Sequence, residues 1–154
     1  MQLESSTAQH NTHVSTYLYA KSALRVPNNP ATHTTTLRDL ARSRCLVLRD
    51  LLRVKSSLDS ADETAQTAAM KRLLESLTDH ISFGHFRLLR EYQQETHLLA
   101  AMASNTDQLL VFLDAHGADS QAPYSSRLAS DLEALAWHLE ARFDIEDDVI
   151  SSGC

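Results

Sequence analysis

The chain has 154 residues, 43% of them hydrophobic, and its formal net charge is −6. This length supports one sizeable hydrophobic core, so residues 1–154 are predicted to form a single domain. The acidic balance argues against a nucleic-acid-binding protein, because such proteins neutralise phosphates with Lys and Arg.

Glycine and proline occur only three times each, and this scarcity predicts an all-α fold with few tight turns. The expected architecture is an antiparallel helical bundle with four main helices plus an N-terminal helix. The sequence contains no run of about 18 apolar residues, the length that would predict a membrane span. Cys45 and Cys154 do not suggest a disulfide framework, and residues 1–6 lack a signal-peptide pattern, so the protein is predicted to be cytoplasmic.

The first predicted helix covers residues 3–26 and is stopped by the Pro27–Pro30 segment, which begins a loop to Thr35. Residues 1–35 are therefore an expected N-terminal helix and loop. The second helix is predicted over residues 36–58, where leucine and valine recur at helical spacing.

The third helix is expected to begin at a capping box formed by Ser60 and Glu63 and to run to at least Glu91. A turn is predicted somewhere between Tyr92 and Ala103.

The next helical segment carries apolar residues from 98 to 113, and Gly117 suits a left-handed position at its end. A loop over residues 118–123 follows. The last helix is predicted over residues 125–150, with residues 151–154 as a flexible tail.

The third predicted helix has an unusual distribution of side chains. At about 100° per residue, one narrow stripe holds Met70, Leu74, Leu77, Ile81, Gly84 and Leu88. The opposite side, where a soluble helix is normally charged, holds Asp79, Ser82, Phe83, Phe86 and Arg90. Exposed aromatic surface costs free energy unless it is covered, so this side predicts a contact with another protein.

Arg142 and Glu146 fall on the apolar stripe of the last predicted helix, one turn apart. Charges in that position must be paired. The simpler interpretation is an ion pair that His85 and Glu140 extend into a structural polar network between the third and last helices. A metal or catalytic site is the alternative, but the Glu-x-x-His and His-x-x-x-Glu spacings of metal-binding bundles do not occur around His85 or His138.

The sequence also lacks a Gly-rich phosphate loop, a nucleophile flanked by a base, and a recognisable pair of catalytic carboxylates. We therefore predict a binding protein rather than an enzyme, with no cofactor and no bound metal.

Three segments carry a family resemblance: residues 77–86 (LTDHISFGHF), residues 104–109 (SNTDQL) and residues 139–150 (LEARFDIEDDVI). In this order they resemble the regulator of sigma D family, the Rsd/AlgQ anti-sigma proteins of bacteria. Three segments in register are more specific than one, because each alone is an ordinary helical stretch.

The resemblance implies a cytoplasmic, non-enzymatic bundle that binds the primary sigma factor of RNA polymerase and does not bind nucleic acid directly. In that family, binding to the sigma factor's C-terminal promoter-reading domain withholds it from core polymerase. The family's binding positions match Asp79, Ser82 and Phe86. The resemblance thus implies Phe86 as an apolar anchor, Asp79 as the partner of a basic side chain, and Ser82 as a small residue that permits close approach.

Three alternatives stay open at this point. The chain could be a hemerythrin-like metal-binding bundle, or an adaptor for a different protein partner. Phe83 and Phe86 could also be covered by the chain's own N-terminal helix.

Overall fold

The computed structural model describes residues 34–92, 96–117 and 126–152. The predicted helix over residues 3–26 and the predicted loop over 118–123 lie outside these ranges. Within them the structure consists of helices and contains no strand, so the all-α prediction is confirmed. The long helices are α2 (Thr34–Ser57), α3 (Glu63–Phe83), α5 (Thr96–His116) and α6 (Ser126–Ser152).

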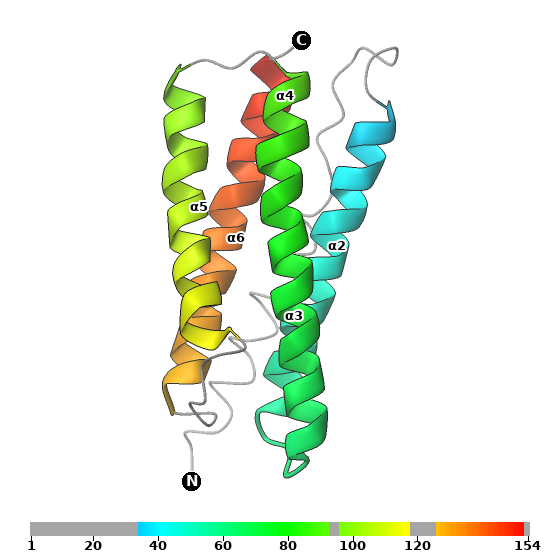
Figure 1. The fold of residues 1–154 in the computed structure, drawn as a ribbon, viewed down its shortest axis with the longest axis vertical. Coiled ribbons are helices and arrows are strands. Elements are labelled where there is room, and N and C mark those ends of the chain that lie inside the picture. The colour runs from blue at the N-terminus through cyan, green and yellow to red at the C-terminus, as the bar shows by residue number, and fades with distance from the viewer. Residues whose placement is uncertain (1–33, 93–95, 118–125, 153–154) are drawn as a thin grey trace, which may run out of the picture.

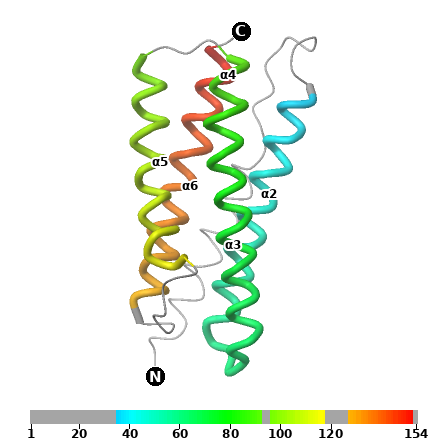
Figure 2. Tube along the Cα trace, viewed as in Figure 1, coloured from blue at the N-terminus to red at the C-terminus, as the bar shows by residue number. Residues whose placement is uncertain are grey.

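The four long helices form an antiparallel bundle, as predicted (Figure 1). Helix α2 packs along α3, and α5 packs along α6. Contacts of α2 with α6 and of α3 with α5 join the two pairs, and the Cα trace shows the same arrangement (Figure 2). Among the described helices, none has the length and apolar character needed to cross a bilayer.

Helix α3 begins two residues later than the predicted capping box implies. The N-cap is Asp62, whose carboxylate accepts a hydrogen bond from the Ala65 amide at 3.1 Å. Ser60 instead accepts from the amide of Asp62 at 3.1 Å. The capping-box prediction was therefore wrong, because Ser60 orders the residue that caps the helix rather than capping it.

Helix α3 continues directly into a π-turn, η1 (Gly84–Leu88), and a short helix, α4 (Leu89–Glu91). We call this continuous segment, residues 63–91, the α3 rod. Tyr92 is extended, with φ −111° and ψ 133°. The prediction that helical structure reaches Glu91 is confirmed, and the helical run ends at Tyr92, the first residue of the interval in which a turn was predicted.

Two of the predicted helix ends differ from the structure. Gly117 follows the last residue of α5 but does not adopt a positive φ, so the left-handed cap predicted there was wrong. Helix α6 runs through Ser152, so the first two residues of the predicted tail are helical.

The buried apolar residues form two separate clusters. The large core cluster draws on α2, α3, α5 and α6 and includes Val47, Leu48, Leu51, Val54, Met70, Leu73, Leu77, Ile81, Leu109, Phe112, Leu128, Leu132, Leu135, Leu139 and Phe143. The small core cluster lies nearer α4 and comprises Leu40, Leu88, Tyr92, Leu98, Met102, Val149 and Ile150. A layer of buried charged residues separates them along the helices.

Candidate functional site: a buried charged layer and an exposed aromatic surface

The charged layer consists of Arg44 from α2, His80 from α3, and Arg142, Glu146 and Asp147 from α6. Their exposed fractions range from 0% to 8%. Removing charges from water costs free energy, so this arrangement persists only if each charge finds partners. Two guanidinium groups and two carboxylates meet here, together with one imidazole.

Glu146 is the centre of the layer. Its Oε2 accepts a hydrogen bond from Arg44 Nε at 2.9 Å. Its Oε1 accepts from Arg142 Nε at 3.0 Å and lies 2.9 Å from His80 Nε2. One carboxylate thereby ties α2, α3 and α6 together, which fixes how these helices align along the bundle.

Arg44 is held by two further acceptors on α6. Its Nη2 donates to Asp147 Oδ1 and to the carbonyl of Phe143, both at 3.0 Å. The guanidinium carbon lies 4.8 Å from the centre of the Phe143 ring, a cation–π geometry.

Arg142 extends the layer to α5 and back to α3. Its Nη1 donates to Thr106 Oγ1 at 2.9 Å, and its Nη2 lies 3.5 Å from the carbonyl of Ile81. Gly84 sits directly against this guanidinium, because a Cβ added at Gly84 would lie 2.2 Å from Arg142 Nη2.

The charges of the layer determine the ionisation of Glu146. Burial by itself raises the pKa of a carboxyl group, because it removes water from the charged form. Here His80, Arg44 and Arg142 outweigh burial and lower the pKa of Glu146 from 4.5 to about 2. Burial lowers the pKa of Arg142, and Glu146 opposes this shift.

The structure pairs Arg142 with Glu146 on the core stripe but brings a different histidine to them. His85 is exposed, and its ring packs edge-on against Phe86, with centroids 4.9 Å apart. His80 takes the buried place beside Glu146, so the prediction that His85 extends the pair is corrected. Glu140 is half-buried and is not a member of the charged layer.

Sequence reasoning missed three members of the layer: Arg44, His80 and Asp147. A signal existed for Arg44, which falls between Leu40 and Val47 on the apolar stripe of α2. A second charged residue on a core stripe would have pointed to a partner for Arg142 and Glu146.

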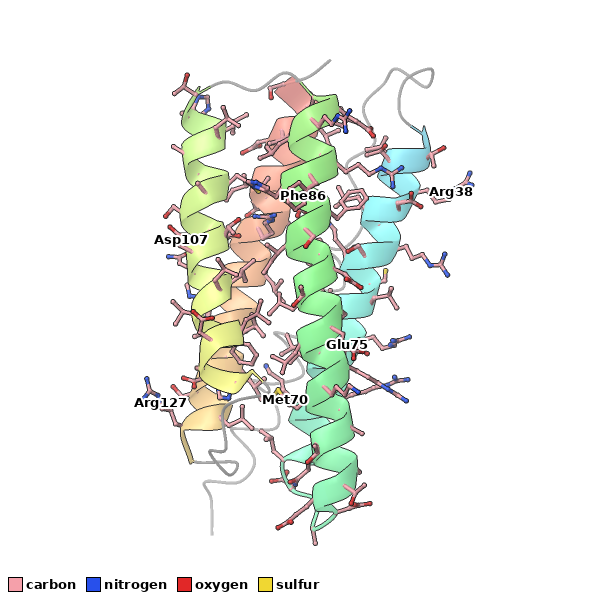
Figure 3. The ribbon with its side chains drawn as sticks, in the orientation of Figure 1. Arg38, Met70, Glu75, Phe86, Asp107 and Arg127 are labelled. Atoms are coloured by element: carbon pink, nitrogen blue, oxygen red, sulfur yellow. The ribbon has the colours of Figure 1, made fainter. Side chains whose placement is uncertain are left out.

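The outer side of the same rod carries what we call the Phe86 surface: Asp79, Ser82, Phe86 and Arg90. Phe86 is 71% exposed, and Figure 3 labels it on the upper half of the rod. Asp79 and Arg90 are exposed and Ser82 is half-buried. An aromatic ring this exposed, next to charged groups, is typical of a binding surface.

Phe83 lies elsewhere. It is half-buried and packs against the small core cluster, and the Arg87 guanidinium lies over its ring at 5.2 Å. The prediction that Phe83 faces outward with Phe86 is corrected, because the ring packs against the small core cluster instead.

Within the described ranges, no three His, Cys, Asp or Glu side chains come together as a possible metal site. The buried carboxylates of the layer are engaged with arginines instead.

Comparison with known proteins gives a family match. The family model described as "Regulator of RNA polymerase sigma(70) subunit, Rsd/AlgQ" matches residues 28–152. A protein of Pectobacterium atrosepticum named "Regulator of sigma D" is 31% identical over 113 residues, which cover 62% of this chain and 69% of that protein. No solved structure matches.

Proposed function

Because the chain belongs to the Rsd/AlgQ family of regulators of the RNA polymerase sigma(70) subunit, we propose that it is an anti-sigma factor. It binds the C-terminal promoter-reading domain of the primary sigma factor and withholds that subunit from RNA polymerase. It acts in the cytoplasm by binding alone, without catalysis. The family match favours this hypothesis over a hemerythrin-like metal-binding bundle.

The observation that carries the proposed site is the exposure of Phe86. A large aromatic side chain that is 71% exposed leaves apolar area that a partner can cover, and central aromatic anchors commonly dominate binding free energy. In the proposed complex Phe86 enters an apolar pocket of the sigma domain.

Charge supports a basic partner. The chain has a net charge of −6, and Asp79 is exposed on the same surface. A promoter-reading domain is basic because it contacts phosphates, so opposite charge would speed and orient its association with this bundle. Asp79 pairs with a basic side chain of the partner, and Ser82 leaves room for close approach. Arg90 lies at the edge of the contact.

The test is a direct binding measurement with the purified primary sigma factor, followed by competition with core RNA polymerase. We expect wild-type protein to bind sigma and to lower the amount of sigma bound to core polymerase. Phe86→Ala and Asp79→Arg should weaken binding. Matched controls are Trp137→Ala, which removes a 64% exposed aromatic ring from α6, and Asp107→Arg on the exposed side of α5.

Lack of sigma binding by the wild-type protein would refute the function. Equal binding by wild type, Phe86→Ala and Asp79→Arg would refute the site but leave the function standing.

A further inference from the structure

Phe86 sits in the middle of the π-turn η1. The amide of Leu89 donates to the carbonyl of Gly84, five residues earlier, whereas in an α-helix the acceptor would be four residues earlier. Such turns are rare within α-helices and are found frequently at functional sites. The turn therefore determines how the Phe86 ring is presented.

The inner side of the turn is fixed by the charged layer. Gly84 is buried, and a Cβ added there would lie 2.2 Å from Arg142 Nη2 and 3.1 Å from its Cζ. No side chain fits between this turn and the guanidinium. The guanidinium is itself tied down, because Nε donates to Glu146 and Nη1 to Thr106.

The other side of the turn is tied to α2. Arg87 Nη1 donates to Asp39 Oδ2 at 2.6 Å, and Arg87 Nε lies 3.5 Å from Glu91 Oε1. Residues on both sides of Phe86 thus contact different helices: Gly84 lies against the Arg142 guanidinium of α6, and Arg87 is paired with Asp39 of α2. These two contacts fix the orientation of the π-turn about the axis of the rod.

We infer that Gly84 and Arg142 are positioning residues for the Phe86 surface: the buried guanidinium holds the π-turn in the geometry that presents the Phe86 ring outward. As far as it names the ligand, this inference rests on the proposed anti-sigma function. Its structural content, that Arg142 controls Phe86 from inside the bundle, does not.

The first experiment reads the position of the ring without any partner. 4-Fluorophenylalanine is incorporated at position 86 alone, and its ¹⁹F resonance is compared between the wild-type background and Gly84→Ala. A methyl group at position 84 must displace Arg142 or the turn, so we expect the resonance to shift. Leu109→Ala is the control, because it creates a cavity in the large core cluster on another helix. In this variant the ¹⁹F resonance of residue 86 should stay at the wild-type position.

Arg142→Lys serves as a second variant if Gly84→Ala does not fold. Lysine keeps one cation for Glu146 but loses the Nη2 group that lies against Gly84. A wild-type ¹⁹F resonance in the folded variant would overturn the inference.

The second experiment is a double-mutant cycle on sigma affinity with Phe86→Ala, Gly84→Ala and both together. If Gly84 acts through Phe86, Gly84→Ala should weaken binding about tenfold alone and have almost no effect once Phe86 is alanine. Leu109→Ala should keep wild-type affinity. If Gly84→Ala lowers sigma affinity equally with and without Phe86, the losses are additive and contradict a positioning role. A general loss of folded protein would give this additive result, because it does not depend on Phe86.

The two experiments fail separately. If wild-type protein does not bind sigma, the proposed function is lost while the ¹⁹F comparison still decides the positioning role. If sigma binds but the cycle is additive and the resonance does not move, the function stands and the positioning role is wrong.

Discussion

Around Gly84 and Phe86, the inner and outer sides of the α3 rod depart from the usual distribution of side chains in a helical bundle. The inner side meets a layer of charges where apolar residues are expected, and the outer side exposes a phenylalanine where charges are expected. The inner groups have partners within the same chain, whereas Phe86 has most of its surface open to solvent. One stretch of sequence can thus stabilise the bundle on one side and leave an aromatic ring open to a partner on the other.

The largest effect is expected from removing the central carboxylate of the inner side. Glu146→Gln leaves the buried Arg44 and Arg142 without their shared counter-charge. Breaking a buried ion pair in this way costs about 3–5 kcal/mol of unfolding free energy, measurable by denaturant titration. Asp148→Asn, at an exposed position on the same helix, should change stability by less than about 0.5 kcal/mol. Equal stability of the two variants would contradict a structural role for the layer.

Acid titration tests the same side without a mutation. The folded-state pKa of Glu146 is lowered from 4.5 to about 2, so its stabilising contribution is full above about pH 5 and is lost as pH falls toward 2. The loss is on the order of 3 kcal/mol. Because Glu146→Gln cannot titrate at this position, its free energy of unfolding should fall less than that of the wild type over the same pH interval. Parallel curves of unfolding free energy against pH would argue against the lowered pKa of Glu146.

The two phenylalanines of the rod separate stability from binding. Phe86→Ala should weaken sigma binding by about 2 kcal/mol, roughly thirtyfold, with little change in unfolding free energy. Phe83→Ala should instead reduce stability by about 1–3 kcal/mol, since its ring packs on the small core cluster. Calorimetric binding and thermal denaturation of both variants measure the two effects. Loss of stability in Phe86→Ala together with loss of sigma binding in Phe83→Ala would contradict these roles.

The smallest expected effect lies at Asp79. Asp79→Asn should slow association with sigma several-fold at low salt and have little effect at high salt, because exposed charges are screened within about 10 Å at 0.1 M salt. Stopped-flow rates at two ionic strengths measure this difference. Asp107→Asn on α5 is the matched control, and an equal salt dependence in both variants would remove Asp79 from the site.

The helices themselves could be predicted from sequence because their apolar spacing is regular. The predicted segment over residues 36–58 is the observed α2, Thr34–Ser57, to within two residues at either end. The predicted segment over 125–150 likewise corresponds to α6. Periodicity of this kind depends on one helix at a time, so it needs no knowledge of its neighbours.

The choice between His80 and His85 could not be made in that way. On a helical wheel they lie about 60° and 80° to either side of Leu77, so either could border the core. Which histidine is buried depends on where α2 and α6 lie. Ser43 Oγ of α2 lies 2.8 Å from His80 Nδ1, and Glu146 Oε1 of α6 lies 2.9 Å from His80 Nε2. Those contacts are tertiary and leave no trace in the spacing along α3.

The π-turn was invisible for a similar reason. An ideal wheel assumes a constant rotation per residue, and η1 departs from it between Gly84 and Leu88. The wheel correctly placed Phe86 at an exposed position, but it placed Phe83 there as well. The burial of each ring depends on how the turn packs in the bundle, and the sequence pattern does not contain that packing.

The charged layer also divides the hydrophobic interior into two unequal parts. Cooperative unfolding is transmitted by contiguous packing, so a polar partition lets the smaller part open while the larger part stays intact. We therefore expect amide protons near Leu40, Tyr92 and Leu98 to exchange with solvent through subglobal openings, ahead of those near Leu77 and Leu135.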